Sequence, residues 1–62
     1  MTEAILLTTE EAAELLNIGR SKVFDLIRNG ELGSIKIGRL RRVPLASIHE
    51  FTARLMEEAA AR

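Results

Sequence analysis

The stretch EAAELLNIGRSKVFDLIR, residues 11–28, decides the fold, because it predicts two short helices that are joined by a tight turn. The apolar side of the first helix is formed by Ala12, Ala13, Leu15 and Leu16. The two alanines give a flat surface on which a second helix can lie close. Residues 17–19, Asn-Ile-Gly, then break the helical pattern, since Asn tolerates a left-handed backbone and Gly starts a helix at little steric cost. The stretch therefore predicts a helix-turn-helix.

The second helix of this unit has an apolar side and a polar side. Its apolar side repeats at i, i+3 and i+4 and consists of Val23, Leu26 and Ile27. The other side carries side chains that can hydrogen-bond base edges or phosphates, namely Arg20, Ser21, Lys22, Asp25 and Arg28. Arg20 and Lys22 are expected to matter most, because the first turn of a recognition helix usually meets the bases. An ordinary helical hairpin with a solvated charged surface is the alternative interpretation.

Phe24 lies beside Val23 on the second helix, and two roles are open to it. It could stack on bases as a wedge, or it could pack in the core between the hairpin and the last helix. We favour the core, because most aromatic residues at helical spacing are buried.

The distribution of charge along the chain favours a polyanionic partner, although the net charge is zero. Residues 1–19 carry four acids and no base, giving −4, and residues 43–62 carry three acids and two bases, giving −1. Residues 20–42 carry seven bases and two acids, giving +5. A local field of one sign attracts a polyanion over a Debye length of roughly 8 to 10 Å.

Length and composition set the class of protein. A chain of 62 residues allows one small domain, and we expect residues 1–62 to form it with an ordered core of about residues 6–56. The absence of cysteine excludes disulfides and thiolate zinc sites. The longest apolar run, residues 4–7, is too short for a membrane span and is not preceded by the basic residues of a secretion signal. We therefore expect a cytoplasmic protein.

The sequence predicts no enzyme and no cofactor. It has no glycine-rich phosphate loop and no pair of acids at a suitable site. The single histidine, His49, is expected to be exposed on the last helix, because catalysis by histidine needs an orienting partner and a substrate pocket.

Local signals mark where the first two helices begin and end. Thr8 and Glu11 fit a capping box, with Leu7 placed to pack on Ala12. Before it, residues 1–3 are expected to fray and residues 4–7 to be extended. The second helix is expected to run from about residue 20 to residue 29, and the left-handed backbone that Gly30 allows would end it.

The periodicity changes from helical to alternating after this stop. Residues 34–37 and 40–43 predict a two-stranded hairpin whose tip is Gly38-Arg39. Three residues are expected to point to the core: Ile35, Ile37 and Val43. The outward residues are basic: Lys36, Arg39, Arg41 and Arg42. The hairpin is interpreted as a basic wing beside the recognition helix, and a solubilised edge hairpin is the alternative. Such long cations suit phosphates or a narrow minor groove better than a detailed base code.

Pro44 is expected to close the hairpin and open a third helix. Steps of three and four residues predict a stripe that supplies much of the core: Leu45, Ile48, Phe51, Leu55, Met56 and Ala59. Residues 57–62 have no obvious partner and are expected to fray or to dock elsewhere.

This order of parts, from residue 6 to residue 55, resembles the small excisionase-type helix-turn-helix proteins, which are related to the MerR-like winged helices. The matching motifs are T-x-E-E-A-A-x-L-L, V-F-x-L-I-R-x-G-E-L, I-K-I-G-R and R-R-V-P. The chain differs from the usual family pattern at Gly19, Asp25 and Gly33, where members often have Ser or Thr, a basic residue and Pro. The resemblance implies a mainly α winged helix-turn-helix with a small β-hairpin.

The resemblance also implies a function. Such proteins are cytoplasmic, sequence-specific binders of double-stranded DNA that bind near an attachment site and direct a partner recombinase, an integrase, toward excision. One small domain buries little surface, so several copies are expected to act together and bend the duplex. The basic wing and the acidic last helix suggest head-to-tail contact between copies. A small transcriptional regulator of the same fold and a protein-binding adaptor are the alternatives.

Overall fold

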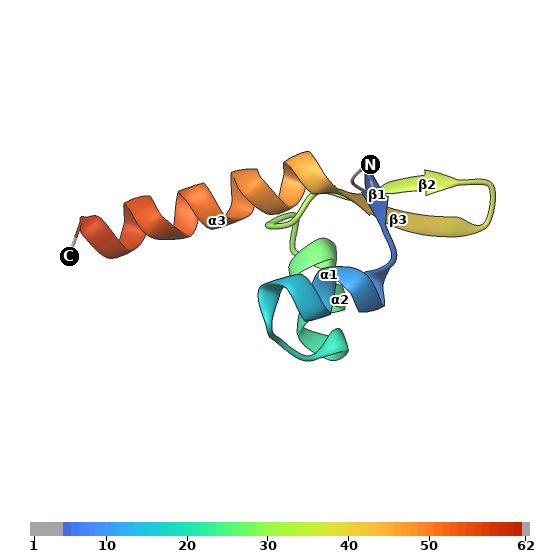
Figure 1. The fold of residues 1–62 in the computed structure, drawn as a ribbon, viewed down its shortest axis with the longest axis horizontal. Coiled ribbons are helices and arrows are strands. Elements are labelled where there is room, and N and C mark those ends of the chain that lie inside the picture. Colours follow the sequence, from blue (N-terminus) through green and yellow to red (C-terminus); the bar gives the residue numbers. More distant parts are fainter. Residues whose placement is uncertain (1–4, 62) are drawn as a thin grey trace, which may run out of the picture.

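The computed structural model describes residues 5–61; the residues that were expected to fray, 1–3, lie outside this range. The chain forms three helices and three short strands (Figure 1). In chain order these are β1 (Leu6–Leu7), α1 (Thr9–Leu16), α2 (Arg20–Arg28), β2 (Ile35–Ile37), β3 (Leu40–Pro44) and α3 (Leu45–Ala60). The molecule is elongated, with extents of 40 × 30 × 17 Å, and the hairpin tip and the far end of α3 lie at opposite ends of the long axis (Figure 1).

The predicted capping box begins α1. The Glu11 backbone N–H donates to the Thr8 hydroxyl at 3.0 Å, and the Thr8 N–H donates to the Glu11 carboxylate at 2.9 Å. These bonds satisfy backbone donors that the first turn leaves without partners, so this prediction is confirmed.

The turn between α1 and α2 also follows the sequence signals. Asn17 is the only described residue other than glycine with a left-handed backbone, at φ 57° and ψ 45°. Gly19 is the N-cap of α2 with an extended backbone. Ile18 packs against the core from the corner. The helix-turn-helix is confirmed.

The end of α2 is a Schellman motif. Gly30 has φ 78°, its N–H donates to the Ile27 carbonyl at 3.1 Å, and the Glu31 N–H donates to the Leu26 carbonyl at 2.9 Å. This arrangement satisfies the last carbonyls of the helix and confirms the predicted stop. The chain then turns inward, and Leu32 becomes a fully buried core residue, which was not predicted from the sequence.

The sheet has three strands in the order β1-β3-β2, all antiparallel. Residues 4–7 were expected to be extended. Residue 4 lies outside the described range, and Leu6 and Leu7 form β1, where Leu6 pairs with Pro44 and Leu7 with Val43. The wing, β2 and β3 with their connection, has the predicted two-residue tip. Gly38 has φ 62° and Arg39 a negative φ, the combination that a type II′ turn requires.

The prediction that Ile35 and Ile37 point to the core with Val43 is wrong. Val43 is fully buried, whereas Ile35 is 42% and Ile37 51% exposed. The pairing explains this, because Ile35 lies opposite Arg42 and Ile37 opposite Leu40. Residues that lie opposite each other share a face and neighbours along a strand alternate, so Val43 lies on the other face of the sheet.

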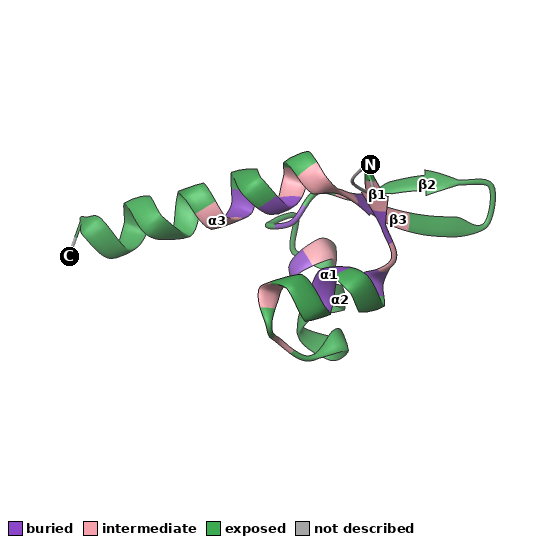
Figure 2. Cartoon of the chain, in the orientation of Figure 1, coloured by how far each residue is buried: buried purple, intermediate pink, exposed green. Residues whose placement is uncertain are grey.

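The core lies where the helix-turn-helix, β1, β3 and the start of α3 meet (Figure 2). It consists of Leu7, Ala12, Ala13, Val23, Leu26, Leu32, Val43, Ile48 and Phe51, with Leu16, Ile18, Ile27 and Leu45 packed against it. Ala12 and Ala13 are buried as predicted. Leu15 is exposed, so the prediction that it lies on the apolar side is wrong. It is exposed because it points about a third of a turn away from Leu16 around the helix axis.

Only the first half of the stripe on α3 reaches the core. Ile48 and Phe51 are buried, but Leu55 and Met56 are 45% and 73% exposed, and Ala59 is exposed. The helix continues beyond the rest of the molecule, and all residues from 56 to 60 are exposed (Figure 2). The prediction that this stripe supplies much of the core is therefore confirmed for Leu45, Ile48 and Phe51 and wrong for the other three residues, Leu55, Met56 and Ala59.

Candidate nucleic-acid interface

The polar side of α2 faces solvent. Four of the five predicted residues are exposed and Asp25 is half-buried, while Val23 and Leu26 hold the other side of the helix in the core. The five predicted side chains are therefore available to a partner along one short helix.

Arg20 is held by two contacts at the start of α2. Its guanidinium donates to the Glu10 carboxylate at 3.1 Å, and its Cζ lies 5.8 Å from the centre of the Phe24 ring. Both charged side chains of the pair are 61% exposed, so the pair contributes little to stability. Its consequence is geometric, because it fixes the direction of the first cation on the helix.

Glu10 is an acid that lies beside the cations of α2, and its role there was not predicted from the sequence. A hydrogen bond from its own backbone N–H is the main reason that the pKa of Glu10 lies below its ordinary value. The Thr9 hydroxyl and the charges of Arg20 and Arg42 lower the pKa further. Glu10 therefore stays ionised at neutral pH beside Arg20. Ten residues separate Glu10 from Arg20, so no local pattern could reveal the pair.

The acid that departs from the family pattern has a partner on its own helix. Asp25 accepts a hydrogen bond from Arg28, three residues later, and both side chains are at least half exposed. Residues three apart are neighbours on a helix surface. Asp25 thus offsets the charge of Arg28 and limits the directions in which the Arg28 side chain can point.

The prediction that Phe24 packs in the core is wrong. Its side chain is exposed, at 41% for the residue, and it lies under the Arg20 guanidinium. The inward side of α2 is already filled by Val23 and Leu26. Phe24 therefore joins the solvent side of α2, where an aromatic ring can stack on a base or pack on a sugar.

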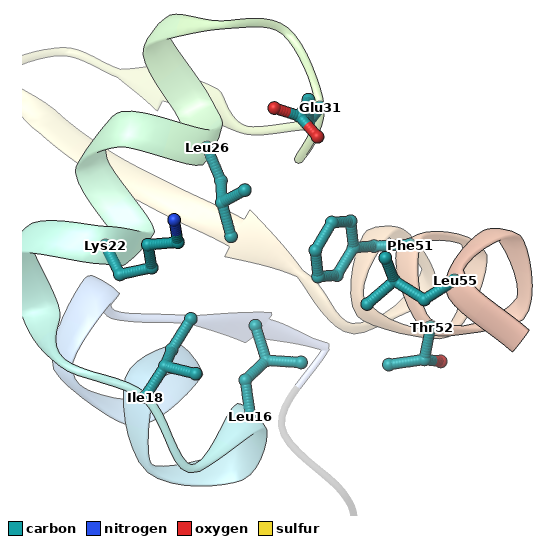
Figure 3. Close-up of a pocket in the computed structure, with 8 residues that line it drawn as sticks. All are labelled: Leu16, Ile18, Lys22, Leu26, Glu31, Phe51, Thr52 and Leu55. Carbon is teal, nitrogen blue, oxygen red and sulfur yellow. The ribbon is translucent and has the colours of Figure 1, made fainter. Parts of the chain in front are cut away.

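Lys22 stands apart from the other cations of α2. Its side chain borders a groove of about 450 Å³ between the helix-turn-helix and α3 (Figure 3). The other lining residues are mainly apolar: Leu16, Ile18, Leu26, Glu31, Phe51, Thr52 and Leu55. Lys22 thus lies at the edge of the surface that Arg20 and Arg28 occupy.

The wing brings a second set of cations. Lys36, Arg39 and Arg41 are exposed and Arg42 is half-buried. Arg41 donates to the Ser34 hydroxyl and Arg42 to the Arg41 carbonyl, both at 2.9 Å. Within residues 5–61 the only ion pairs are those of Arg20 and Arg28, so no described carboxylate neutralises the wing.

The fold and this surface define a class of protein. A short helix with exposed polar and basic groups, presented by a helix-turn-helix beside a basic wing, is the arrangement of a winged helix-turn-helix DNA-binding protein. None of the helices within residues 5–61 is both long enough and apolar enough to cross a membrane.

Comparisons with known proteins give the family. Residues 6–56 match the family described as "Helix-turn-helix domain". The chain is 48% identical over 54 residues to an "Excisionase" of Streptomyces ambofaciens, covering 87% of each chain. It is 47% identical over 57 residues to a "Probable excisionase" of Saccharopolyspora erythraea, covering 92% of this chain and 58% of that protein. The chain belongs to the excisionase-type helix-turn-helix family, whose members are DNA-binding proteins and not enzymes.

Two further findings complete the comparisons. The chain is 47% identical over 45 residues to a Mycobacterium tuberculosis protein named as an antitoxin, VapB50, covering 73% of this chain and 35% of that protein. No solved structure matches the chain.

Proposed function

We propose that this protein is a recombination directionality factor that binds double-stranded DNA near an attachment site, bends it and promotes integrase-mediated excision. The observation that carries the proposal is the likeness to a protein named excisionase over 87% of both chains. The functional unit in this proposal is a single domain, residues 1–62, with an ordered core of about residues 6–56.

In this proposal α2 enters the major groove and the wing contacts the adjacent backbone or minor groove. The α2 residues that meet DNA are Arg20, Ser21, Lys22, Asp25 and Arg28. The wing residues are Lys36, Arg39, Arg41 and Arg42. The exposure of both sets supports this assignment, as does the lack of carboxylates paired with the wing among the described residues.

A binding experiment tests the assignment of α2. Fluorescence anisotropy is measured with a duplex selected by the protein from a random-sequence pool and with a scrambled duplex of the same length. Arg20→Ala is expected to weaken binding to the selected duplex by about tenfold or more. Lys22→Ala is the matched comparison and is expected to cost less, because its side chain borders the groove beside α3. Wild-type discrimination in a variant that combines Arg20→Ala with Lys22→Ala would refute the role of α2.

A recombination assay tests the biological role. Purified integrase, the attachment sites and the protein are combined, and excision and integration products are counted. The proposal requires that the protein raises excision and not integration. An integrase gene beside the gene for this chain would identify the partner to use.

A regulator of transcription is the second candidate, and the relative named as an antitoxin favours it. The duplex selected from the random pool separates the two roles. A match to a promoter supports a regulator, and a match to an attachment region supports excision. A protein-binding adaptor is the weakest candidate, and binding to a protein partner that is indifferent to salt would favour it.

Association between copies is part of the proposal. The wing cations lie at one end of the long axis, and Glu57 and Glu58 lie near the other end, on the second half of α3 (Figure 1). Contacts between two different surfaces build open chains of subunits, so copies would line up head to tail along adjacent sites. Such a row would supply the contacts that a single small domain lacks.

A further inference from the structure

The wing has one face that the charge pattern does not explain. Three large apolar side chains, Ile35, Ile37 and Leu40, are 42%, 51% and 53% exposed. The pairing of Ile37 with Leu40 and of Ile35 with Arg42 places all three on the same face, with Arg42 at its base. Ile37 and Leu40 flank the two-residue tip, so the most exposed part of this apolar face is also its farthest point (Figure 1).

The base of the wing and the start of α2 both adjoin α1. β3 packs against α1. Arg20, the first residue of α2, is paired with Glu10 in the first turn of α1. A duplex that is bound to α2 can therefore meet the wing, whose tip is flanked by Ile37 and Leu40.

The cations around the apolar face indicate its occupant. Arg39 lies in the tip, Arg42 lies at the base of the face, and Lys36 and Arg41 project from the opposite face. A DNA minor groove presents sugar carbons on its walls and phosphates along both rims, which matches an apolar strip bordered by cations. A protein partner would need an apolar strip between two acidic borders to fit as well.

We propose that Ile37 and Leu40 enter the minor groove beside the α2 site and act as an apolar wedge that kinks the duplex. This inference rests on the proposed DNA binding, and it gives the bending function to two named side chains. Branched aliphatic side chains can separate neighbouring base pairs in this way, and burying them on binding repays part of the cost of unstacking.

The test uses the full chain and a duplex selected by the protein from a random-sequence pool. One sample of this duplex carries a fluorescent donor and acceptor at its ends, which report bending, and another carries 2-aminopurine at the wing-proximal step, which reports unstacking. Ile37→Thr and Leu40→Thr keep a branched or strand-compatible side chain at exposed positions, so the melting temperature should stay at the wild-type value. Met56→Thr is the control, because Met56 is also exposed and apolar but lies on α3.

Each wing variant is expected to weaken binding by about tenfold and to remove most of the change in energy transfer and in 2-aminopurine fluorescence. The salt dependence should stay unchanged, because no cation is lost.

Unchanged bending in both variants would overturn the proposal, whether or not affinity falls. If both variants bind and bend DNA normally but fail in integrase-mediated excision, the apolar face docks the recombinase and the wedge is refuted. If the wild-type protein selects no duplex, DNA binding itself fails, which also overturns the wedge.

Discussion

The directions of two arginine side chains on α2, Arg20 and Arg28, are fixed by carboxylates of the same chain. Glu10 and Asp25 each hold one arginine of α2, whereas the wing cations have no carboxylate partner within residues 5–61. A phosphate that approaches α2 must compete with an internal acid, while a phosphate that approaches the wing need not. The two halves of the surface are therefore suited to different tasks, with α2 oriented for selective contacts and the wing free for attraction at long range.

Replacing Glu10 tests this division. Glu10→Gln should raise affinity for random duplex by about threefold and lower discrimination for a selected duplex, because Arg20 gains a free charge and loses its fixed direction. Glu14→Gln is the control, since Glu14 is exposed on the same helix and makes no ion pair among the described residues. Anisotropy titrations with both duplexes measure the effect. Equal changes in the two variants would mean that only net charge matters.

The two phenylalanines should behave differently when truncated. Phe51 is 7% exposed, so Phe51→Ala should cost about 3 to 5 kcal/mol, enough to unfold most of so small a domain. Phe24 is 41% exposed, so Phe24→Ala should cost about 1 kcal/mol and mainly weaken DNA binding. Urea unfolding followed by circular dichroism gives both values. A loss of stability in Phe24→Ala as large as in Phe51→Ala would mean that the ring is buried in solution.

At the scale of elements, local sequence signals were enough to predict the helix-turn-helix, but they were not enough to predict which face of the wing is buried. The capping box at Thr8, the left-handed Asn17 and the stop at Gly30 each depend on a few neighbouring residues, and all were predictable. The inward direction of Ile35 and Ile37 was not, because it depends on pairing with β3 and on where the helices end. Sequence periodicity shows that a face is apolar but does not show what covers it.

Removing two wing cations tests the role of this element. Arg39→Ala combined with Arg41→Ala should lower affinity for selected and random duplexes by similar factors, because both side chains suit phosphates. The slope of log affinity against log salt should become shallower by about 2. Titrations at several salt concentrations check both expectations. A loss of discrimination with random-duplex affinity intact would show that the wing reads sequence.

At the scale of the whole molecule, the long axis separates two exposed surfaces. The wing is basic at one end, and the second half of α3 is exposed with Leu55, Met56 and two glutamates at the other (Figures 1 and 2). The stripe on α3 continues past the core with the same period, which is why the sequence could not show where burial ends. An isolated helix of this kind is marginal in water, so a contact along it would stabilise it.

Charge reversal on α3 tests whether copies meet there. Glu57→Lys combined with Glu58→Lys places positive charge where the wing of a neighbouring copy would approach, so binding to adjacent sites should lose its cooperativity. Binding to a single site should be unchanged or slightly tighter, because both residues are exposed and the added charge attracts DNA. Gel-shift titrations on duplexes with one and two adjacent sites separate these effects.

Reversing Arg39 and Arg41 to Glu in a second protein and mixing it with the first should restore pairing on two sites, although the reversed wing binds DNA less well. If the charge-reversed α3 variant still fills two sites cooperatively, the copies do not associate through the wing and α3, and any cooperativity must come from the bend that each copy imposes on the duplex.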